Sequence, residues 1–519
     1  MCRFKVLVCL ALFGLFGNRA PAQFYRSSNL SFGRSRIQYS PFYWSFYRIH
    51  SADIYYYPQS QSLAIFTARQ ADSLIRQMEK KTHYQAKHKL QIIIFAKYAD
   101  YQQSNIQWKQ DETYYQSGWT PLYNHKILIY YDGDMRHFQE HLQSGIAQWM
   151  VNQLMLEQSR LGQTDHLPIW FKEGAGPYFA EIWNETLHAE VRDGFLSGRY
   201  NQLFQLPKAA QINAGNSFWR FIAHRYGADR ITPILQVAAL TDNFDKAFES
   251  ILLKKIDQLL PEWKAFYTDE SNDSSLRFSN LLPFYQPLTR YDHFSTSEDG
   301  RFTAFTTNKE GQSCIYLLDR TTSQLKRLSS RHYRVEDFPD DSKPLLLWHP
   351  NKPLLSVIDE KNAKVYLRHY HLQKDRWDKA QILFVEKVTG AAYAHNGRYL
   401  ALTALQNGQS DLFLYDPNGK NMTRITNDKF DVADPCFIQH DQVVVVSTNR
   451  PTQPTDTLEK ASYHISTKDL FAYHISERKW EPLTQTPDIE ERQPIETESG
   501  NMLYIRNDGN SNQHCIGRA

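Results

Sequence analysis

Two histidines and a glutamate in the first third of the chain could carry metal chemistry. His137, Glu140 and His141 stand in the run HFQEH, and histidines four residues apart share one face of a helix. Two imidazoles placed in this way can bind zinc, and a glutamate beside them can act as a general base. The run lacks an acidic third ligand far downstream, and 19 histidines in the chain make a chance match easy. We therefore expect the polar first turn of a helix here.

A second group of residues follows on the same predicted helix. Gln148 and Asn152 are also four residues apart, with Trp149 next to the first of them. The segment LPIWFKEG then carries Glu173, and Tyr178 follows it. Amides are weak zinc ligands, and an indole nitrogen does not accept a proton at neutral pH. This set therefore lacks the groups that a zinc hydrolase needs.

The order of these segments resembles the thermolysin-like metallopeptidases (gluzincins, or peptidase MA) over residues 51–268. In that family a His-Glu-x-x-His helix binds zinc, and a Trp-x-x-Glu-Gly segment adds the third ligand. The resemblance places Gln148 and Asn152 at two ligand positions, Trp149 at the general base and Glu173 at the third ligand. It implies a degenerate domain without catalytic residues, metal or other cofactor. These four positions and Tyr178 would form a candidate binding cleft, unless they only pack the helix against its neighbour.

The elements that must position these residues can also be predicted. Residues 90–95 (LQIIIF) and 126–131 (KILIYY) are apolar runs typical of buried strands. Apolar residues at helical spacing predict helices over residues 67–81, 137–157, 216–226, 231–240 and 242–252. Strands followed by helices indicate an α+β domain.

The second half of the chain is built from a repeat. A turn that leads into a strand occurs at DGRFTAF and NGRYLAL, from residues 299 and 396, with weaker copies over residues 351–358, 440–447 and 499–505. A further strand begins near positions 315, 365, 412 and 470, and intervals of about 50 residues are typical of propeller blades. The Asp-Gly and Asn-Gly pairs predict positive φ in the turns.

This repeat resembles the TolB-type and dipeptidyl-peptidase-type propeller repeat (WD40-like), with the consensus S-x-D-G-x-x-I-A-F. The best copy matches it at Ser297, Asp299, Gly300, Ala304 and Phe305. The resemblance runs from residue 285 to the end and implies an all-β propeller of about five blades. The last copy stops soon after residue 505 in an irregular-looking tail, which predicts half a blade. Residues 282–289 would complete it, or the chain is a shortened form.

A multidomain protein is therefore predicted, with a signal peptide over residues 1–22, a peptidase-like domain over 23–270, a linker over 271–281 and a propeller over 282–519. The start of the chain has the basic residues, short apolar run and Ala-Pro-Ala site of a secretory signal. No other segment is apolar enough to cross a membrane.

Charge and cysteine usage exclude other classes of protein. The formal net charge is +3, and three basic residues of the predicted signal peptide account for it. The mature chain is then nearly neutral, which does not favour nucleic acid. Three widely spaced cysteines outside the signal peptide do not make a disulfide framework.

We expect a non-catalytic scaffold in the periplasm of a Gram-negative bacterium. It would bind envelope or secreted proteins, and peripheral association with the outer membrane is left open. One alternative is a zinc hydrolase with the unorthodox ligands His137, His141 and Glu173. Another is a carbohydrate-binding propeller, for which convergent carboxylates about 5–9 Å apart would be diagnostic.

Overall fold

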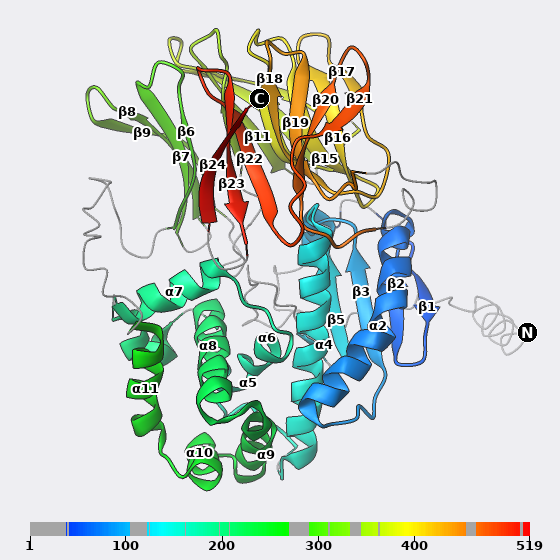
Figure 1. The fold of residues 1–519 in the computed structure, drawn as a ribbon, viewed down its shortest axis with the longest axis vertical. Coiled ribbons are helices and arrows are strands. Elements are labelled where there is room, and N and C mark those ends of the chain that lie inside the picture. Colours follow the sequence, from blue (N-terminus) through cyan, green and yellow to red (C-terminus); the bar gives the residue numbers. More distant parts are fainter. Residues whose placement is uncertain are drawn as a thin grey trace, which may run out of the picture.

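The computed structural model describes residues 38, 41–103, 122–123, 125–160, 162–196, 198–206, 208–268, 290–309, 312–332, 344–361, 364–382, 384–452, 463–508 and 512–518. The predicted signal peptide, the predicted linker and residues 282–289 lie outside this set. Figure 1 shows a helical domain below and a propeller above. Within the described residues, no helix is both long and apolar enough to span a membrane.

A mixed sheet forms one side of the first domain. Its strands are β1 (Ser45–Arg48), β2 (Ala52–Tyr56), β3 (Leu90–Phe95), β4 (Leu122–Tyr123) and β5 (Lys126–Tyr130). They are ordered β1-β2-β3-β5-β4; β2, β3 and β5 are parallel, and the outer pairs are antiparallel. The two strands predicted from apolar runs correspond to β3 and β5. Nearly every side chain of β3 is buried, as expected for a central parallel strand.

Helices form most of the domain. They are α2 (Gln61–Thr82), α3 (Tyr98–Gln103), α4 (Met135–Gln158), α5 (Ile169–Lys172), α6 (Ala175–Phe179), α7 (Glu185–Leu196), α8 (Lys208–Tyr226), α9 (Ile231–Thr241), α10 (Phe244–Leu252) and α11 (Ile256–Thr268), with 3-10 turns η2 (Pro58–Ser60), η3 (Arg199–Gln205) and η4 (Ala228–Arg230). Among the described residues, α2, α3 and α4 are the helices that pack on the sheet most extensively. The five predicted helices correspond to α2, α4, α8, α9 and α10. The carboxylate of Asp134 accepts a hydrogen bond from the backbone N–H of Arg136 at 2.8 Å and so caps α4.

Aromatic side chains fill the centre of the helical domain. Trp149, Trp170 and Trp219 are all at most 2% exposed. Trp170 packs edge to face on Phe218 of α8, with 5.2 Å between the ring centroids. Deletion of such a buried ring costs about 3–5 kcal/mol. This contact joins α5 to α8, and α4, which carries Trp149, packs against α6. The helices α4, α5 and α6 carry or flank the predicted site positions.

The second domain is a propeller with five antiparallel sheets in the described residues, which confirms the fold and blade number predicted from the repeat. Blade 1 contains β6 (Arg290–Thr296), β7 (Phe302–Lys309), β8 (Gln312–Asp319) and β9 (Gln324–His332); blade 2 contains β10 (Leu345–Trp348), β11 (Leu354–Lys361), β12 (Lys364–His371) and β13 (Arg376–Gln381); blade 3 contains β14 (Lys387–Tyr393), β15 (Leu400–Gln406), β16 (Gln409–Asp416) and β17 (Asn421–Arg424); blade 4 contains β18 (Val432–Ile438), β19 (Val443–Thr448), β20 (Asp469–His474) and β21 (Lys479–Pro482); blade 5 contains β22 (Glu490–Glu496), β23 (Asn501–Asn507) and β24 (Asn512–Arg518).

The blades are arranged around a common axis. The first strands of successive blades contact one another, from β6 and β10 through β14 to β18 and β22, which is how propeller blades bury their inner edges. Gly300 and Gly397, in the turns between first and second strands, have φ of 68° and 70°. The positive φ predicted for these turns is thus confirmed.

The end of the chain differs from the prediction of an irregular tail and half a blade. Asn512–Arg518 forms β24, the third strand of blade 5, and pairs antiparallel with β23. Leu503 stands opposite Ile516 in this ladder, yet Ile516 is 72% exposed. The sequence pattern did not predict this strand. It pairs with β23 through backbone groups, and because the strand is exposed it contains polar residues that are uncommon in strands.

The helical domain packs against one face of the propeller. Leu405 at the end of β15 and Tyr463 join the hydrophobic core of the first domain, and the rings of Phe66 and Tyr463 are 6.1 Å apart. Leu405 lies at the end of blade 3 that carries the β15–β16 turn. Because strands in a blade alternate in direction, the β14–β15 and β16–β17 turns lie at the opposite, free face.

Candidate functional site

The two amide side chains on α4 are bonded to each other and to the next segment. Nε2 of Gln148 donates to Oδ1 of Asn152 at 3.0 Å and to the carbonyl oxygen of Lys172 at 3.3 Å. Residues four apart on a helix lie one above the other, which explains the first contact. Lys172 precedes Glu173, so the structure brings three of the predicted positions together. Gln148 is only 1% exposed.

Gly176 on α6 leaves room for the Gln148 side chain. A Cβ atom at position 176 would lie 2.3 Å from Oε1 of Gln148 and 3.0 Å from its Cβ, closer than van der Waals contact allows. Glycine at position 176 therefore provides the space that the amide of Gln148 occupies.

A lysine pairs with the carboxylate that the resemblance assigns to the third zinc ligand. Nζ of Lys208, at the start of α8, lies 3.1 Å from Oε2 of Glu173, and the two side chains are 19% and 15% exposed. A zinc ion would need this oxygen, together with imidazoles in place of the amides. The ammonium group instead supplies the compensating positive charge from within the protein. No motif marks Lys208 in the sequence, so it was not predicted.

Trp149 and Tyr178 have packing roles. Trp149 is fully buried, and its Nε1–H donates to Nδ1 of His125 at 3.1 Å. Burial, followed by the charges of His88 and Lys126, lowers the pKa of His125, which suits a neutral ring that accepts this bond. Tyr178 is half-buried, and burial raises its pKa. That the five positions line a binding cleft stays a prediction, and Gln148 and Trp149 offer almost no surface for it.

The alternative ligand set is not brought together. His137 and His141 lie on the first two turns of α4, as predicted for a polar helix start. His141 precedes Gln148 by seven residues, or about 10 Å along the helix. Nδ1 of His137 lies 3.0 Å from Oδ2 of Asp132. Among the residues that the structure describes, no group of three or more His, Cys, Asp or Glu side chains is arranged to hold a metal ion.

A buried group of charges attaches α4 to the propeller, and sequence reasoning missed it. Asp431, which precedes β18, accepts hydrogen bonds from the hydroxyl of Tyr131 at 2.7 Å and from the backbone N–H of Met135 at 2.8 Å. Lys468, which precedes β20, pairs with Asp134. Carboxylates are favoured at a helix N-terminus because its N–H groups point outward. The first turn of α4 is therefore held by two acidic side chains, one from each domain.

Burial and charge act differently on the two carboxyl groups. Burial raises the pKa of Asp431 to about 7, the nearby Asp134 adds to the shift, and Lys468 opposes it. Burial also opposes ionisation of Asp134, but Lys468 outweighs it and holds the pKa of Asp134 below its usual range. Burial and the negative charge of Asp134 thus disfavour a second negative charge on Asp431.

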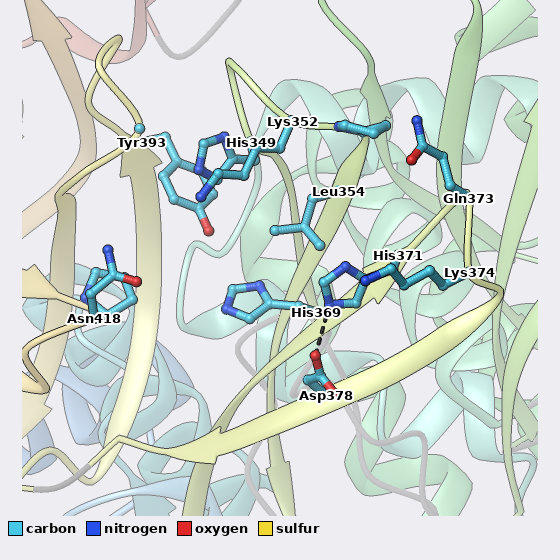
Figure 2. A pocket seen from close by; sticks show the side chains of 13 residues that line it. His349, Lys352, Leu354, His369, His371, Gln373, Lys374, Asp378, Tyr393 and Asn418 are labelled. Carbon is cyan, nitrogen blue, oxygen red and sulfur yellow. Dashed lines mark hydrogen bonds and ion pairs between the residues drawn. The ribbon is translucent and has the colours of Figure 1, made fainter.

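A pocket of about 380 Å³ lies between blades 2 and 3 (Figure 2). Its lining comes from strands and turns at the free face of the propeller and consists of His349, Lys352, Pro353, Leu354, His369, His371, Gln373, Lys374, Asp378, Tyr393, Gly397, Pro417 and Asn418. These residues spread over two blades, so no local motif marks them.

Comparison with protein-family models finds no match for this sequence, and comparison with curated proteins finds none either. Among solved structures, the chain is similar to TolB from Acinetobacter baumannii, with 12% identity, a TM-score of 0.32 and coverage of 44% of this chain and 54% of that chain. This chain thus spans about half the length of that TolB.

The chain is also similar to the β-propeller domain of the Trilobed protease from Pyrococcus furiosus, with 9% identity, a TM-score of 0.30 and coverage of 44% of this chain and 72% of that chain. A structure of prolyl endopeptidases is similar at 10% identity and a TM-score of 0.32, with coverage of 44% of this chain and 34% of that chain. Likeness at this level carries no conclusion about activity or partners, and the propeller fold is assigned from strand order and blade packing.

Proposed function

We propose that this chain is a non-catalytic scaffold of the cell envelope, in which a degenerate peptidase-like domain and a propeller hold other proteins. The ion pair between Glu173 and Lys208 carries this proposal. A zinc peptidase needs the carboxylate at this position for its metal, and here an ammonium group 3.1 Å away engages it.

The neighbouring positions support the same interpretation. Gln148 is hydrogen-bonded to Asn152 and Lys172, and Trp149 is buried with its N–H donated to His125. The α4 side chains of Gln148, Trp149 and Asn152 cannot act as a general base or as strong zinc ligands. Their contacts stabilise the packing of α4 against α5 and α6. The peptidase-like scaffold would then be retained for its shape.

The attachment of the two domains supports a scaffold with a defined binding face. Asp431 and Lys468 fix the start of α4 on one face of the propeller, and Leu405 and Tyr463 add apolar contacts. In the part of the chain that the structure describes, the helical domain does not cover the opposite face, which carries the turns between first and second strands (Figure 1), and we propose this face for partners. We propose envelope or secreted proteins as these partners because the first 22 residues have the pattern of an export signal.

Site-specific photocrosslinking in living cells tests this proposal. A photoreactive amino acid is placed at Ser323 and, separately, at Arg478, which are exposed positions in free-face turns of blades 1 and 4. Leu253, which is 85% exposed on the helical domain, is the matched control. We expect the mature chain to begin at Gln23 in the envelope fraction and to crosslink a discrete protein from the propeller positions alone.

Two results would count against the scaffold. One is retention of the full-length chain in the cytoplasm, which would remove the envelope from the proposal. The other is an absence of crosslinks from both propeller positions together with peptide hydrolysis by the purified chain.

A further inference from the structure

The pocket between blades 2 and 3 has the chemistry of a small-ligand site. We propose that it binds the carboxylate of an acidic monosaccharide unit, such as a hexuronic acid. This inference does not depend on the scaffold function, because the pocket lies on the propeller and away from the degenerate zinc-site positions. Its volume of about 380 Å³ falls within the usual range for small-molecule sites.

Two adjacent imidazoles on β12 present hydrogen-bonding nitrogens to the pocket. His369 and His371 are two residues apart on one strand and therefore share a face, and Figure 2 shows their rings next to each other. Nδ1 of His369 is bonded to Oγ of Ser356 at 2.9 Å, and Nε2 of His371 is bonded to Oδ2 of Asp378 at 2.8 Å. Each ring thus has one nitrogen fixed by the protein. For the other nitrogen of each ring, the described residues provide no partner, so a ligand can use it.

A third imidazole, that of His349, is held in one tautomer on the other side of the pocket. Nδ1 of His349 accepts a hydrogen bond from the backbone N–H of Asn351 at 3.1 Å, which puts the proton of the neutral ring on Nε2. The Tyr393 ring lies beside it at a tilt, with 5.1 Å between the ring centroids and 45° between the ring planes. The hydroxyl of Tyr393 is 2.8 Å from Oγ of Ser356, the same hydroxyl that holds His369. One hydrogen-bonded network therefore connects both walls of the pocket.

The charges at the rim favour a monoanion. Lys352 and Lys374 line the pocket, and neither forms an ion pair with another described residue. Asp378 is the only carboxylate among the described lining residues, and it is engaged by His371 and by Arg376, which is not itself part of the lining. The two lysines and this aspartate give the lining a net charge of +1, the imidazoles not counted. One carboxylate neutralises this charge, whereas a phosphate dianion would leave one negative charge uncompensated in the pocket.

The remaining lining suits a hydroxylated ring. Leu354, Pro353 and Pro417 provide apolar surface, while Gln373 and Asn418 provide amides for hydroxyl groups. A single, already paired aspartate does not supply the two carboxylates that glycoside hydrolysis requires. The arrangement therefore supports binding of an acidic sugar without cleavage.

Isothermal titration calorimetry of the mature full-length chain, at low ionic strength, tests this site with three probes. Galacturonate is expected to bind saturably with a Kd of roughly 1 mM or tighter. Galactose lacks the carboxylate, and galactose 6-phosphate carries a dianion in its place, so both are expected to bind at least about tenfold more weakly.

The variant K352A/K374A is expected to weaken galacturonate binding about tenfold or more. Both side chains are exposed, so the unfolding temperature should not change. The matched control K479A removes an exposed lysine from the same face of blade 4 and should bind as the parent chain does. The proposal is overturned if galacturonate shows no saturable binding, if galactose binds equally well, if galactose 6-phosphate binds more tightly, or if K352A/K374A keeps the parent affinity.

Discussion

The hydroxyl oxygen of Tyr131 lies 2.7 Å from Oδ1 of Asp431, although 300 positions separate the two residues in the chain. Tyr131 follows the last residue of β5, and Asp431 directly precedes β18 of blade 4. Both side chains are buried. The bond therefore links the sheet of the first domain directly to the propeller, and it orders the start of α4 between them.

This contact leads to a prediction for Asp431→Asn. Burial raises the pKa of Asp431 to about 7, so the folded chain keeps a proton at pH values where the unfolded chain, with its carboxyl pKa near 4, has lost it. The contribution of Asp431 to stability is then lost as the pH rises from about 4 to about 7. Asparagine does not titrate. The parent chain should therefore lose stability between pH 5 and pH 8 relative to the variant. We expect the urea midpoint of the variant minus that of the parent to be larger at pH 8 than at pH 5. A midpoint difference that stays constant over this range would contradict the raised pKa.

A second prediction concerns the pair of Glu173 and Lys208. Replacement of Lys208 by methionine leaves a mostly buried carboxylate without its cation, so we expect a loss of about 2–3 kcal/mol in the free energy of unfolding. The double variant E173Q/K208M should recover most of this loss because the buried charge is removed as well. Denaturant titration of E173Q, K208M and the double variant measures the interaction energy between the two side chains, which is the difference between the effect of the double variant and the sum of the single effects.

Lys246→Met on the exposed surface of α10 is the matched control and should change stability by less than about 0.5 kcal/mol. Additive effects of E173Q and K208M would show that the two side chains do not interact as the structure indicates.

A third prediction concerns Gly176. Alanine at this position would place Cβ 2.3 Å from Oε1 of Gln148, and we expect a destabilisation of about 2 kcal/mol from overpacking. In a Gln148→Ala background the 2.3 Å approach to Oε1 is gone and only the approach to Cβ at 3.0 Å remains. The loss should therefore be clearly smaller, because the better helix propensity of alanine offsets part of the remaining strain. Thermal unfolding of the parent chain, the two single variants and the double variant measures this reduction. An equal loss in both backgrounds would mean that Gln148 is not the reason for glycine at this position.

Sequence patterns were sufficient for the elements that depend on local spacing. The run LQIIIF predicted β3 because a central parallel strand is apolar on both faces. The Asn-Gly pair at Gly397 predicted a positive φ because few other residues adopt it. The interval between repeats predicted the blades. In the first domain, Gln148 contacts Asn152 and the carbonyl oxygen of Lys172, which precedes Glu173; that these positions derive from a zinc site stays a prediction.

The features that the sequence did not predict depend on contacts between distant segments. Lys208 pairs with Glu173 from a separate helix, and Asp431 meets α4 from another domain. The pocket combines His349 with Asn418 from the next blade. Strand β24 has polar residues and lies at the outer side of the described part of blade 5, so hydrophobic alternation could not reveal it.

Elemental analysis of the purified mature chain, after dialysis against trace zinc, tests whether the first domain lacks a zinc site. We predict less than about 0.1 zinc per chain and no peptide hydrolysis, because amides stand at two of the proposed ligand positions and Lys208 pairs with the carboxylate at the third. About one zinc per chain, lost together with hydrolytic activity in His137→Ala, would contradict the non-catalytic scaffold and make the HFQEH segment the active site.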